Sequence, residues 1–329
     1  AQDVEGQQAA PNDGGPRPSV ITLHLGGKNP FRCYNAYLIT GSRHVLVDPG
    51  PPGSAGELLE QLSRHRISLG DIGLIVITHG HPDHFGSASQ YKEWTRAPLA
   101  VHELDAEYVN FGSVPVLKPT TRLGSLFKSL FNMKANPVEP DIILRDGDKL
   151  NRYAGQGRVV QTPGHTAGSI SILLPDGNCI VGDLLMRGLS ARTPSLPWFA
   201  ENESEVRESL QRVVNLGART LLAGHGGPFD VEQLASRFPW LEVPERIKTE
   251  RAPSQPVPVA TASARRASES VRESGEVSQL PAAGERQQTD TGTAPAEGVD
   301  RPRRRRPRRR HPRRRDENPG ATPTGSDGN

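Results

Sequence analysis

Short apolar segments alternate with turn residues from Val20 to about Ile247. Nine of them are five to seven residues long, are rich in β-branched side chains and are bounded by Gly, Pro, Asn or Asp. This pattern is typical of short strands, in which successive side chains point to opposite faces. We therefore expect strands over residues 19–25, 34–40, 43–48, 72–78, 98–102, 158–162, 169–174, 178–182 and 219–223.

Other segments have apolar residues at a helical period. We expect helices over residues 54–65, 86–95, 103–110, 122–133, 204–216 and 230–238. For the helix at 204–216, Ser204 is a candidate N-cap and Gly217 follows the end. Because strands and helices are interspersed, and hairpin-like pairs occur at 34–48 and 169–182, the pattern predicts two sheets covered by helices, an α/β sandwich.

The two ends of the chain have a different composition. Residues 1–18 are polar and rich in Gly, Gln and Pro, and residues 251–329 consist largely of Pro, Ala, Ser, Thr, Glu and Arg without an aromatic residue. Such segments bury too little apolar surface to offset the entropy of ordering. We expect a disordered leader over 1–18, one folded domain over 19–250 and a disordered tail over 251–329.

No apolar run approaches the length of a transmembrane helix, and Ala1 is not followed by a charged and then apolar leader. We expect a cytoplasmic protein without a transmembrane segment, unless a signal peptide was removed before Ala1. The two cysteines, Cys33 and Cys179, lie in apolar strand-like segments, which favours buried reduced thiols over a disulfide.

The formal net charge of +3 conceals two parts of opposite sign. Residues 301–315 hold 11 Arg and no acidic residue, and without them 29 basic residues face 37 acidic ones, a net charge of −8. The Arg run predicts an arm that contacts nucleic acid without sequence specificity. The alternative is a solvated tail with no specific role.

The clearest chemical motif is the segment Thr78-His79-Gly80-His81-Pro82-Asp83-His84, which follows a continuous apolar strand. Three imidazoles and a carboxylate packed into one tight turn would be costly in a core, because each would need a buried partner. Imidazole and carboxylate are good ligands for Zn²⁺ and related cations. The motif therefore predicts a metal site. Alternation along the turn would send His79 and His81 to one cation, and Asp83 and His84 to another.

Three further candidate ligands follow short predicted strands and are flanked by glycine. They are His165 in Thr162-Pro163-Gly164-His165, Asp183 in Val181-Gly182-Asp183 and His225 in Gly224-His225-Gly226. Glycine at a strand end lets the backbone approach a site closely. Taken singly, each residue could be an ordinary turn residue, but together with the first motif they form a consistent set of seven.

This set resembles the metallo-β-lactamase superfamily, in the hydrolase branch that includes glyoxalase II, acyl-homoserine lactonases and RNase Z-like nucleases. The resemblance covers about residues 20–245 and rests on HGHPDH, TPGHTAGS, VGD and AGHG in the family's order. It implies an αββα sandwich for these residues, which are followed by the Arg-rich tail that the composition predicts to be disordered. It also implies that one metal is held by His79, His81 and His165, that the second is held by Asp83, His84 and His225, and that Asp183 bridges both.

A two-metal site implies a hydrolase in which a metal-bridging hydroxide attacks the substrate, because the cations lower the pKa of bound water towards 7. Asp83 is the candidate to accept or relay the proton. We expect cleavage of an ester, thioester or lactone of a small molecule; the alternative is a nuclease that uses the Arg-rich tail as a binding arm. Zn²⁺ is the favoured metal, and Fe or Mn would suit the same ligands.

Some features leave more than one interpretation open. Asp48 could orient a metal ligand or be a turn residue. Trp198 and Phe199 could form a pocket wall or pack in the core. The insertion at 112–140 contains an amphipathic basic segment, which by itself could form a helix on a membrane surface. The resemblance favours a lid over the site, because the family often extends its pocket at this point.

Overall fold

The computed structural model describes residues 19–26, 33–115, 118–127, 134–150, 157–188 and 193–249. The expected leader and tail, 1–18 and 251–329, lie outside these residues. Within the described part of the chain, no helix has the length and apolar character needed to cross a membrane.

The first sheet has the order β1-β2-β3-β4-β5-β6. The strands β1, β2 and β3 are antiparallel neighbours, whereas β3 to β6 run parallel. Their bounds are β1 (Val20–Leu25), β2 (Tyr34–Ile39), β3 (His44–Val47), β4 (Ile72–Val76), β5 (Leu99–His102) and β6 (Ile142–Leu144). The helical elements in this half are α1 (Ala55–Arg64), the 3-10 turn η1 (Leu69–Asp71), α2 (Pro82–Phe85), α3 (Ala88–Thr95), α4 (Ala106–Phe111) and α5 (Arg122–Phe127).

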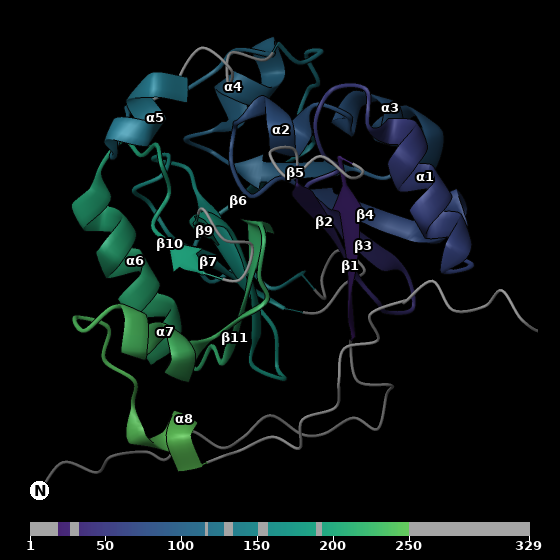
Figure 1. Cartoon of the computed structure of the whole chain (residues 1–329). Helices are drawn as coiled ribbons and strands as arrows, with labels where there is room; N and C mark the ends of the chain where they lie inside the picture. Colours follow the sequence, from purple (N-terminus) through teal and green to yellow (C-terminus); the bar gives the residue numbers. More distant parts are fainter. Residues whose placement is uncertain are drawn as a thin grey trace, which may run out of the picture. The chain divides into compact units, whose positions relative to one another are not determined.

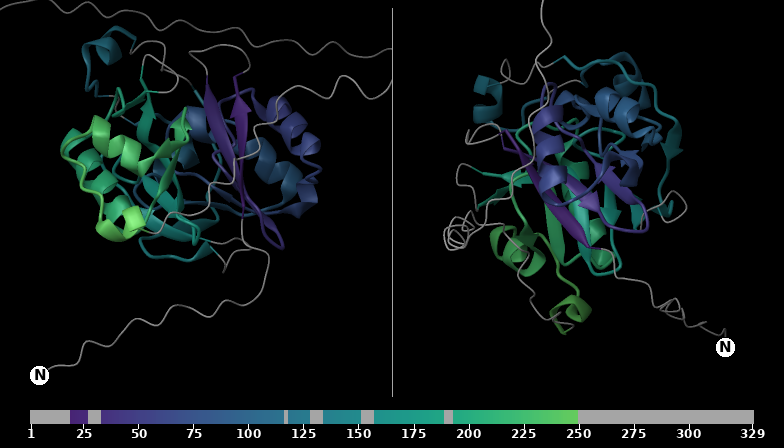
Figure 2. Two further views of the ribbon diagram at one scale, coloured as in Figure 1. Left: turned by 60° about the horizontal axis from the view of Figure 1, so that its bottom comes forward. Right: turned by 90° about the vertical axis from the view of Figure 1, so that its right-hand side faces the viewer.

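The second sheet has the order β12-β11-β9-β8-β7, and β10 pairs with β9. The strands are β7 (Arg158–Gln161), β8 (Ile170–Leu173), β9 (Asn178–Arg187), β10 (Pro194–Ser195), β11 (Thr220–His225) and β12 (Phe229–Asp230). The helices in this half are α6 (Glu203–Asn215), α7 (Val231–Arg237) and α8 (Glu245–Thr249). Figure 1 shows α1 and α3 outside the first sheet and α6 and α7 outside the second, and the views in Figure 2 agree.

Alternation along the strands explains the layers. On β2, Ala36 and Leu38 pack towards α1 and α3, whereas Tyr37 and Ile39 pack into a cluster shared with the second sheet. That shared cluster includes Ile172 of β8. A third cluster joins the outer face of the second sheet to α6 and α7. Because central strands such as β2, β3 and β4 are buried on both faces, the domain has four layers in the order αββα, as predicted.

All nine predicted strands form, and the structure adds three that the sequence did not indicate. These are β6, β10 and β12, which are only two or three residues long and depend on a neighbouring strand. The N-cap of α6 is Asn202, whose side chain accepts hydrogen bonds from the backbone N–H groups of Ser204 and Glu205, so the predicted cap at Ser204 was wrong. The predicted helix at 122–133 is described only to Phe127.

Candidate metal centre

The HGHPDH motif lies where β4 leaves the first sheet. The sequence suggested a turn, but Pro82 opens the one-turn helix α2, with His81 as its N-cap residue. Proline is favoured at the first helical position because its fixed φ suits the helix. A backbone N–H at that position would have no partner within the helix, so proline loses no hydrogen bond there. As a result, His79 and His81 precede the helix and Asp83 and His84 lie within it. All four side chains are buried.

The other three candidates come from the second sheet. His165 lies in the connection between β7 and β8, as predicted, but Asp183 lies inside β9 and His225 is the last residue of β11. The prediction that these two follow strand ends was therefore wrong. The parallel register of β9 and β11 is interrupted around Ala223, and Gly182 has a φ of 51°. Both strands thus continue past the predicted ends, across a locally irregular register.

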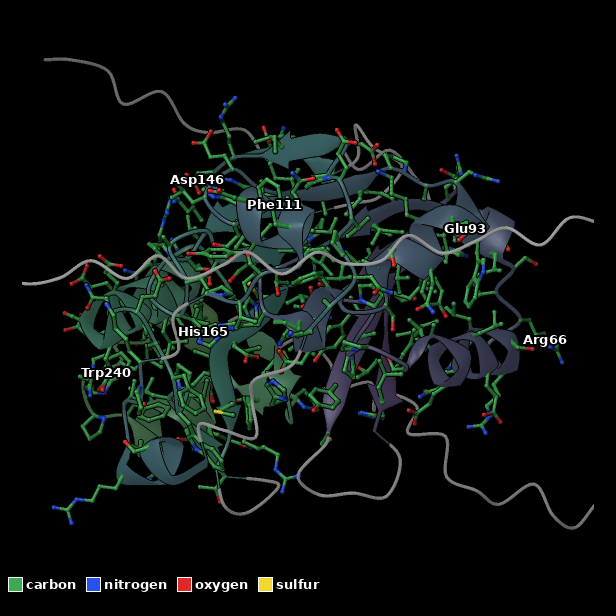
Figure 3. The ribbon with its side chains drawn as sticks, turned by 90° about the horizontal axis from the view of Figure 1, so that it is seen from above. Arg66, Glu93, Phe111, Asp146, His165 and Trp240 are labelled. Carbon is green, nitrogen blue, oxygen red and sulfur yellow. The ribbon has the colours of Figure 1, made fainter. Side chains whose placement is uncertain are left out.

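The structure brings all seven side chains together. His165 Nε2 lies 3.2 Å from His79 Nε2 and 2.8 Å from His81 Nδ1. His225 Nε2 lies 3.2 Å from Asp83 Oδ2, and Asp83, His84 and His225 form a second group whose ligand atoms lie within 4.8 Å of one another. Viewed from above, the labelled His165 lies inside the fold, whereas Arg66 and Trp240 lie at opposite sides (Figure 3).

Asp183 lies between the two groups. Its Oδ1 is 3.4 Å from His84 Nε2, and its Oδ2 is 3.2 Å from His225 Nε2 and 3.7 Å from His165 Nε2. A carboxylate with two oxygens can contact two cations about 3.5–4 Å apart. The position of Asp183 would therefore allow its carboxylate to contact a cation in each group.

Electrostatics divides the cluster into two halves. Burial lowers the pKa of His79 and His165, and it lowers the pKa of His81 to about 3. These imidazoles are therefore neutral, and each keeps a nitrogen lone pair that can bind a cation. Burial also acts to lower the pKa of His84 and His225, but nearby carboxylates, with Asp183 the strongest, outweigh it and raise both. This second half therefore favours a positive charge.

The candidate ligand atoms are chemically suited to divalent cations. The facing atoms His84 Nε2 and Asp183 Oδ1 are both buried, and neither has a hydrogen-bond partner of good geometry among the described residues. Buried polar atoms without partners are costly. Imidazole nitrogen and carboxylate oxygen at these spacings are the usual ligands of zinc, iron and manganese.

The outer nitrogens of three of the five imidazoles, those of His84, His165 and His225, are hydrogen-bonded to neighbouring groups. His84 Nδ1 donates to Asp48 Oδ2 at 2.8 Å, and His165 Nδ1 donates to the carbonyl of Phe199 at 2.8 Å. His225 Nδ1 donates to the carbonyl of Cys33 at 3.1 Å. Such bonds fix the tautomer and the orientation of a metal-binding histidine.

Asp48 satisfies both interpretations that the sequence left open. It occupies a left-handed turn with a φ of 52° and is almost fully buried. Its carboxylate also accepts hydrogen bonds from the backbone N–H and the hydroxyl of Thr78, at 2.8 Å and 2.6 Å. Together with its bond to His84, these contacts hold the HGHPDH segment at its two ends.

A pocket opens onto the cluster. It is lined by candidate ligands and by an apolar wall, namely His81, Pro82, Asp83, His165, Asp183, Met186, Pro197, Trp198, Phe199 and His225. Trp198 and Phe199 thus belong to the pocket wall, the first of the two interpretations. No sequence pattern pointed to Met186, because it lies in the part of β9 beyond the predicted strand end.

The insertion at 112–140 contacts this wall through the backbone. Thr120 N donates to the carbonyl of Trp198 at 2.9 Å, and Ala200 N donates to the carbonyl of Lys118 at 3.0 Å. The apolar side chains that predicted a lid lie outside the residues whose side chains are described. The described contacts thus place Lys118 and Thr120 of the insertion next to the segment that carries the pocket wall.

Comparison with known proteins identifies the family. A model of the metallo-beta-lactamase superfamily matches residues 32–225, more than half of the chain. The chain is 33% identical over 152 residues to the probable metallo-hydrolase MJ0888 of Methanocaldococcus jannaschii. The aligned segment covers 46% of this chain and 66% of that protein. The chain is 27% identical over 218 residues to the probable metallo-hydrolase YflN of Bacillus subtilis, covering 59% and 82%.

A solved structure gives the same result. The metallo-beta-lactamase family protein TTHA1429 from Thermus thermophilus aligns with a TM-score of 0.51 and 28% sequence identity, over 66% of this chain and 77% of that one. The family match includes all seven clustered residues and most of the αββα domain. The chain therefore belongs to the metallo-β-lactamase superfamily and is a metallo-hydrolase.

Proposed function

We propose that the protein hydrolyses an ester, thioester or lactone bond in a small molecule, with two divalent cations held by His79, His81, Asp83, His84, His165, Asp183 and His225. The observation that carries this proposal is the composition of the pocket. Met186, Pro197, Trp198 and Phe199 form an apolar wall beside the candidate ligands. An apolar wall excludes water and suits the uncharged acyl part of such a substrate.

The same pocket disfavours phosphodiesters. No Lys or Arg is among the described residues that line it. Enzymes that bind phosphate groups commonly use Arg or Lys beside the reacting centre to neutralise the phosphate oxygens. A neutral carbonyl substrate needs no such cation from the protein.

The residues of the chain have distinct proposed roles. Bound divalent cations would supply Lewis acidity, which polarises the carbonyl of the substrate and acidifies water. We assign Asp83 as the group that accepts or relays the proton. Burial raises the pKa of Asp83, but His84 and His225 outweigh that effect and lower it to about 2, so its carboxylate is ionised at neutral pH. It also lines the pocket, where substrate would lie.

Metal analysis and a substrate panel test the proposal. We expect close to two metal equivalents per chain, zinc being our first expectation, and chelation should abolish hydrolysis until metal is restored. The panel comprises an aliphatic ester, a thioester, a lactone, a β-lactam and a phosphodiester. Faster turnover of the phosphodiester than of the ester, the thioester and the lactone would reject the proposed function. Full activity without metal would also reject it.

The apolar wall gives a second test. Trp198→Ala should raise KM about 10-fold for substrates with an apolar acyl chain, since lost contacts of this size are worth about 1–3 kcal/mol. The value of kcat should change much less, because Trp198 is not proposed to contact the reacting atoms. Trp94→Ala is the matched control, since Trp94 lies on α3 and is exposed. Equal effects of the two substitutions would remove Trp198 from the binding site.

A nuclease is the second candidate function, and it rests on the 11 arginines of residues 301–315. These residues lie outside the described part of the chain. An Arg-rich segment without aromatic residues would bind nucleic acid chiefly through phosphate charge, so its contacts would weaken steeply with salt. The phosphodiester arm of the panel distinguishes this candidate from the first.

A further inference from the structure

The candidate ligands of each metal come from both sheets, so the two parts must be held at a fixed separation. His79 and His81 follow β4 of the first sheet, whereas His165 lies between β7 and β8 of the second. The outer-nitrogen contacts described above orient single imidazoles. None of those contacts joins the HGHPDH segment to the segment that carries His165.

Asp105 makes such a connection. It is the N-cap residue of α4 and is fully buried, yet its side chain makes no capping hydrogen bond to its own helix. Instead, Oδ2 accepts from Gly80 N at 2.6 Å and from Thr166 Oγ1 at 2.7 Å, while Oδ1 accepts from Gly168 N at 2.9 Å. One carboxylate thus binds the residue between His79 and His81, and also the residue that follows His165.

The glycines at these two positions allow the carboxylate to approach. A Cβ atom on Gly168 would lie 2.4 Å from Asp105 Oδ1, which is well inside van der Waals contact. A Cβ atom on Gly80 would lie 2.9 Å from the Cβ of Tyr108, on the helix that Asp105 begins. The glycine in each motif is therefore explained by the close packing around Asp105, a residue outside both motifs.

We infer that Asp105 is a positioning residue that fixes His165 relative to His79 and His81 and thereby sets the affinity for metal. The inference rests on the proposed metal centre. It also explains why an acid stands at this position. All three partners are donors, and an amide would turn an N–H towards at least one of them, which leaves a buried donor unsatisfied.

The test measures zinc affinity, using Zn²⁺ alone as the probe in competition with a chromophoric chelator. Asp105→Asn should weaken zinc binding about 10- to 100-fold, the usual effect of losing a partner that orients metal ligands. The variant should still fold, because the backbone bond from Ile170 N to the carbonyl of Thr78, at 2.9 Å, joins the same two segments. Thr166→Val removes one donor of the three and should give a smaller loss in the same direction.

Asp146→Asn is the matched control. Asp146 accepts from Gln161 N at 2.9 Å and from Arg212 at 2.8 Å, so it anchors the start of the same His165 segment from another side. Its substitution should lower the melting temperature but leave zinc affinity within about twofold of the wild type, well below the loss expected of a residue that orients ligands.

The outcomes separate the two proposals. If Asp105→Asn and Thr166→Val lower only the melting temperature of the metal-free protein and keep wild-type zinc affinity, Asp105 is merely structural and the inference is overturned. If Asp146→Asn weakens zinc binding as much as Asp105→Asn does, the effect is general destabilisation and the inference also fails. If the wild-type protein itself takes up no zinc, iron or manganese, the proposed metal centre falls first, and the role of Asp105 falls with it.

Discussion

Asp183→Ala is expected to lower kcat/KM by at least about a thousandfold, equivalent to about 4 kcal/mol of transition-state stabilisation, while the chain stays folded. The reason is the position of its carboxylate, within 3.2–3.7 Å of His84, His165 and His225. Under the proposed metal centre it is the one ligand shared by both cations. The measurement is steady-state hydrolysis of the best carbonyl substrate, together with metal content and far-UV circular dichroism.

Asp176→Ala is the control for this variant. Asp176 precedes the same strand, β9, and bonds to Asn178 at the surface, so its loss should leave turnover and metal content unchanged. Wild-type activity in Asp183→Ala would end the two-metal mechanism. Loss of folded structure in that variant would instead assign Asp183 a structural role.

The second large effect concerns stability. Asp48→Ala removes the acceptor of three buried donors and leaves two of them, Thr78 N and His84 Nδ1, without another, each worth about 1–3 kcal/mol; the Thr78 hydroxyl keeps His79 Nδ1 at 3.1 Å. It also places alanine at a φ of 52°, which costs about 1–2 kcal/mol more. We expect the melting temperature to fall by roughly 10 °C or more, since 1 kcal/mol shifts it by about 2–4 °C in a domain of this size.

This experiment is done on chelator-treated protein, so that weaker metal binding does not contribute. Asp48→Asn should be milder, because asparagine tolerates the left-handed region and keeps one acceptor oxygen. Asp71→Ala, which removes an exposed bond to Ser68 N, should lower the melting temperature by only a few degrees at most. If Asp48→Ala and Asp71→Ala proved equally mild, Asp48 would not hold the HGHPDH segment.

The αββα order of the layers could be predicted from the sequence. So could the seven residues that cluster, because each lies near a strand and carries a side chain that is unusual in a core. Their role as metal ligands stays a prediction. The sequence did not predict that Asp183 and His225 lie within strands. Their environment depends on the interrupted register between β9 and β11, which is a property of two strands rather than of either one.

Asp105 shows the same limit more sharply. In the sequence it is one acid among several polar residues of 103–110 and fits an ordinary helix start. Only the packed structure shows that its carboxylate leaves its own helix and contacts Gly80, Thr166 and Gly168. Met186 was missed for a related reason, since β9 extends to Arg187 instead of ending near Gly182. Contacts between distant segments carry no local pattern.

The division of the ligands between two sheets has a thermodynamic consequence. Under the proposed metal centre, each cation joins a group after β4 to a group from the second sheet, so it binds only when both sheets are assembled. A species that binds the native state alone stabilises it by mass action, by about 4 kcal/mol when its free concentration is 1,000 times its Kd. If these residues hold the metal, the free metal concentration of the surroundings would help to set how often the two sheets separate, so that metal supply would control the stability of the fold as well as its chemistry.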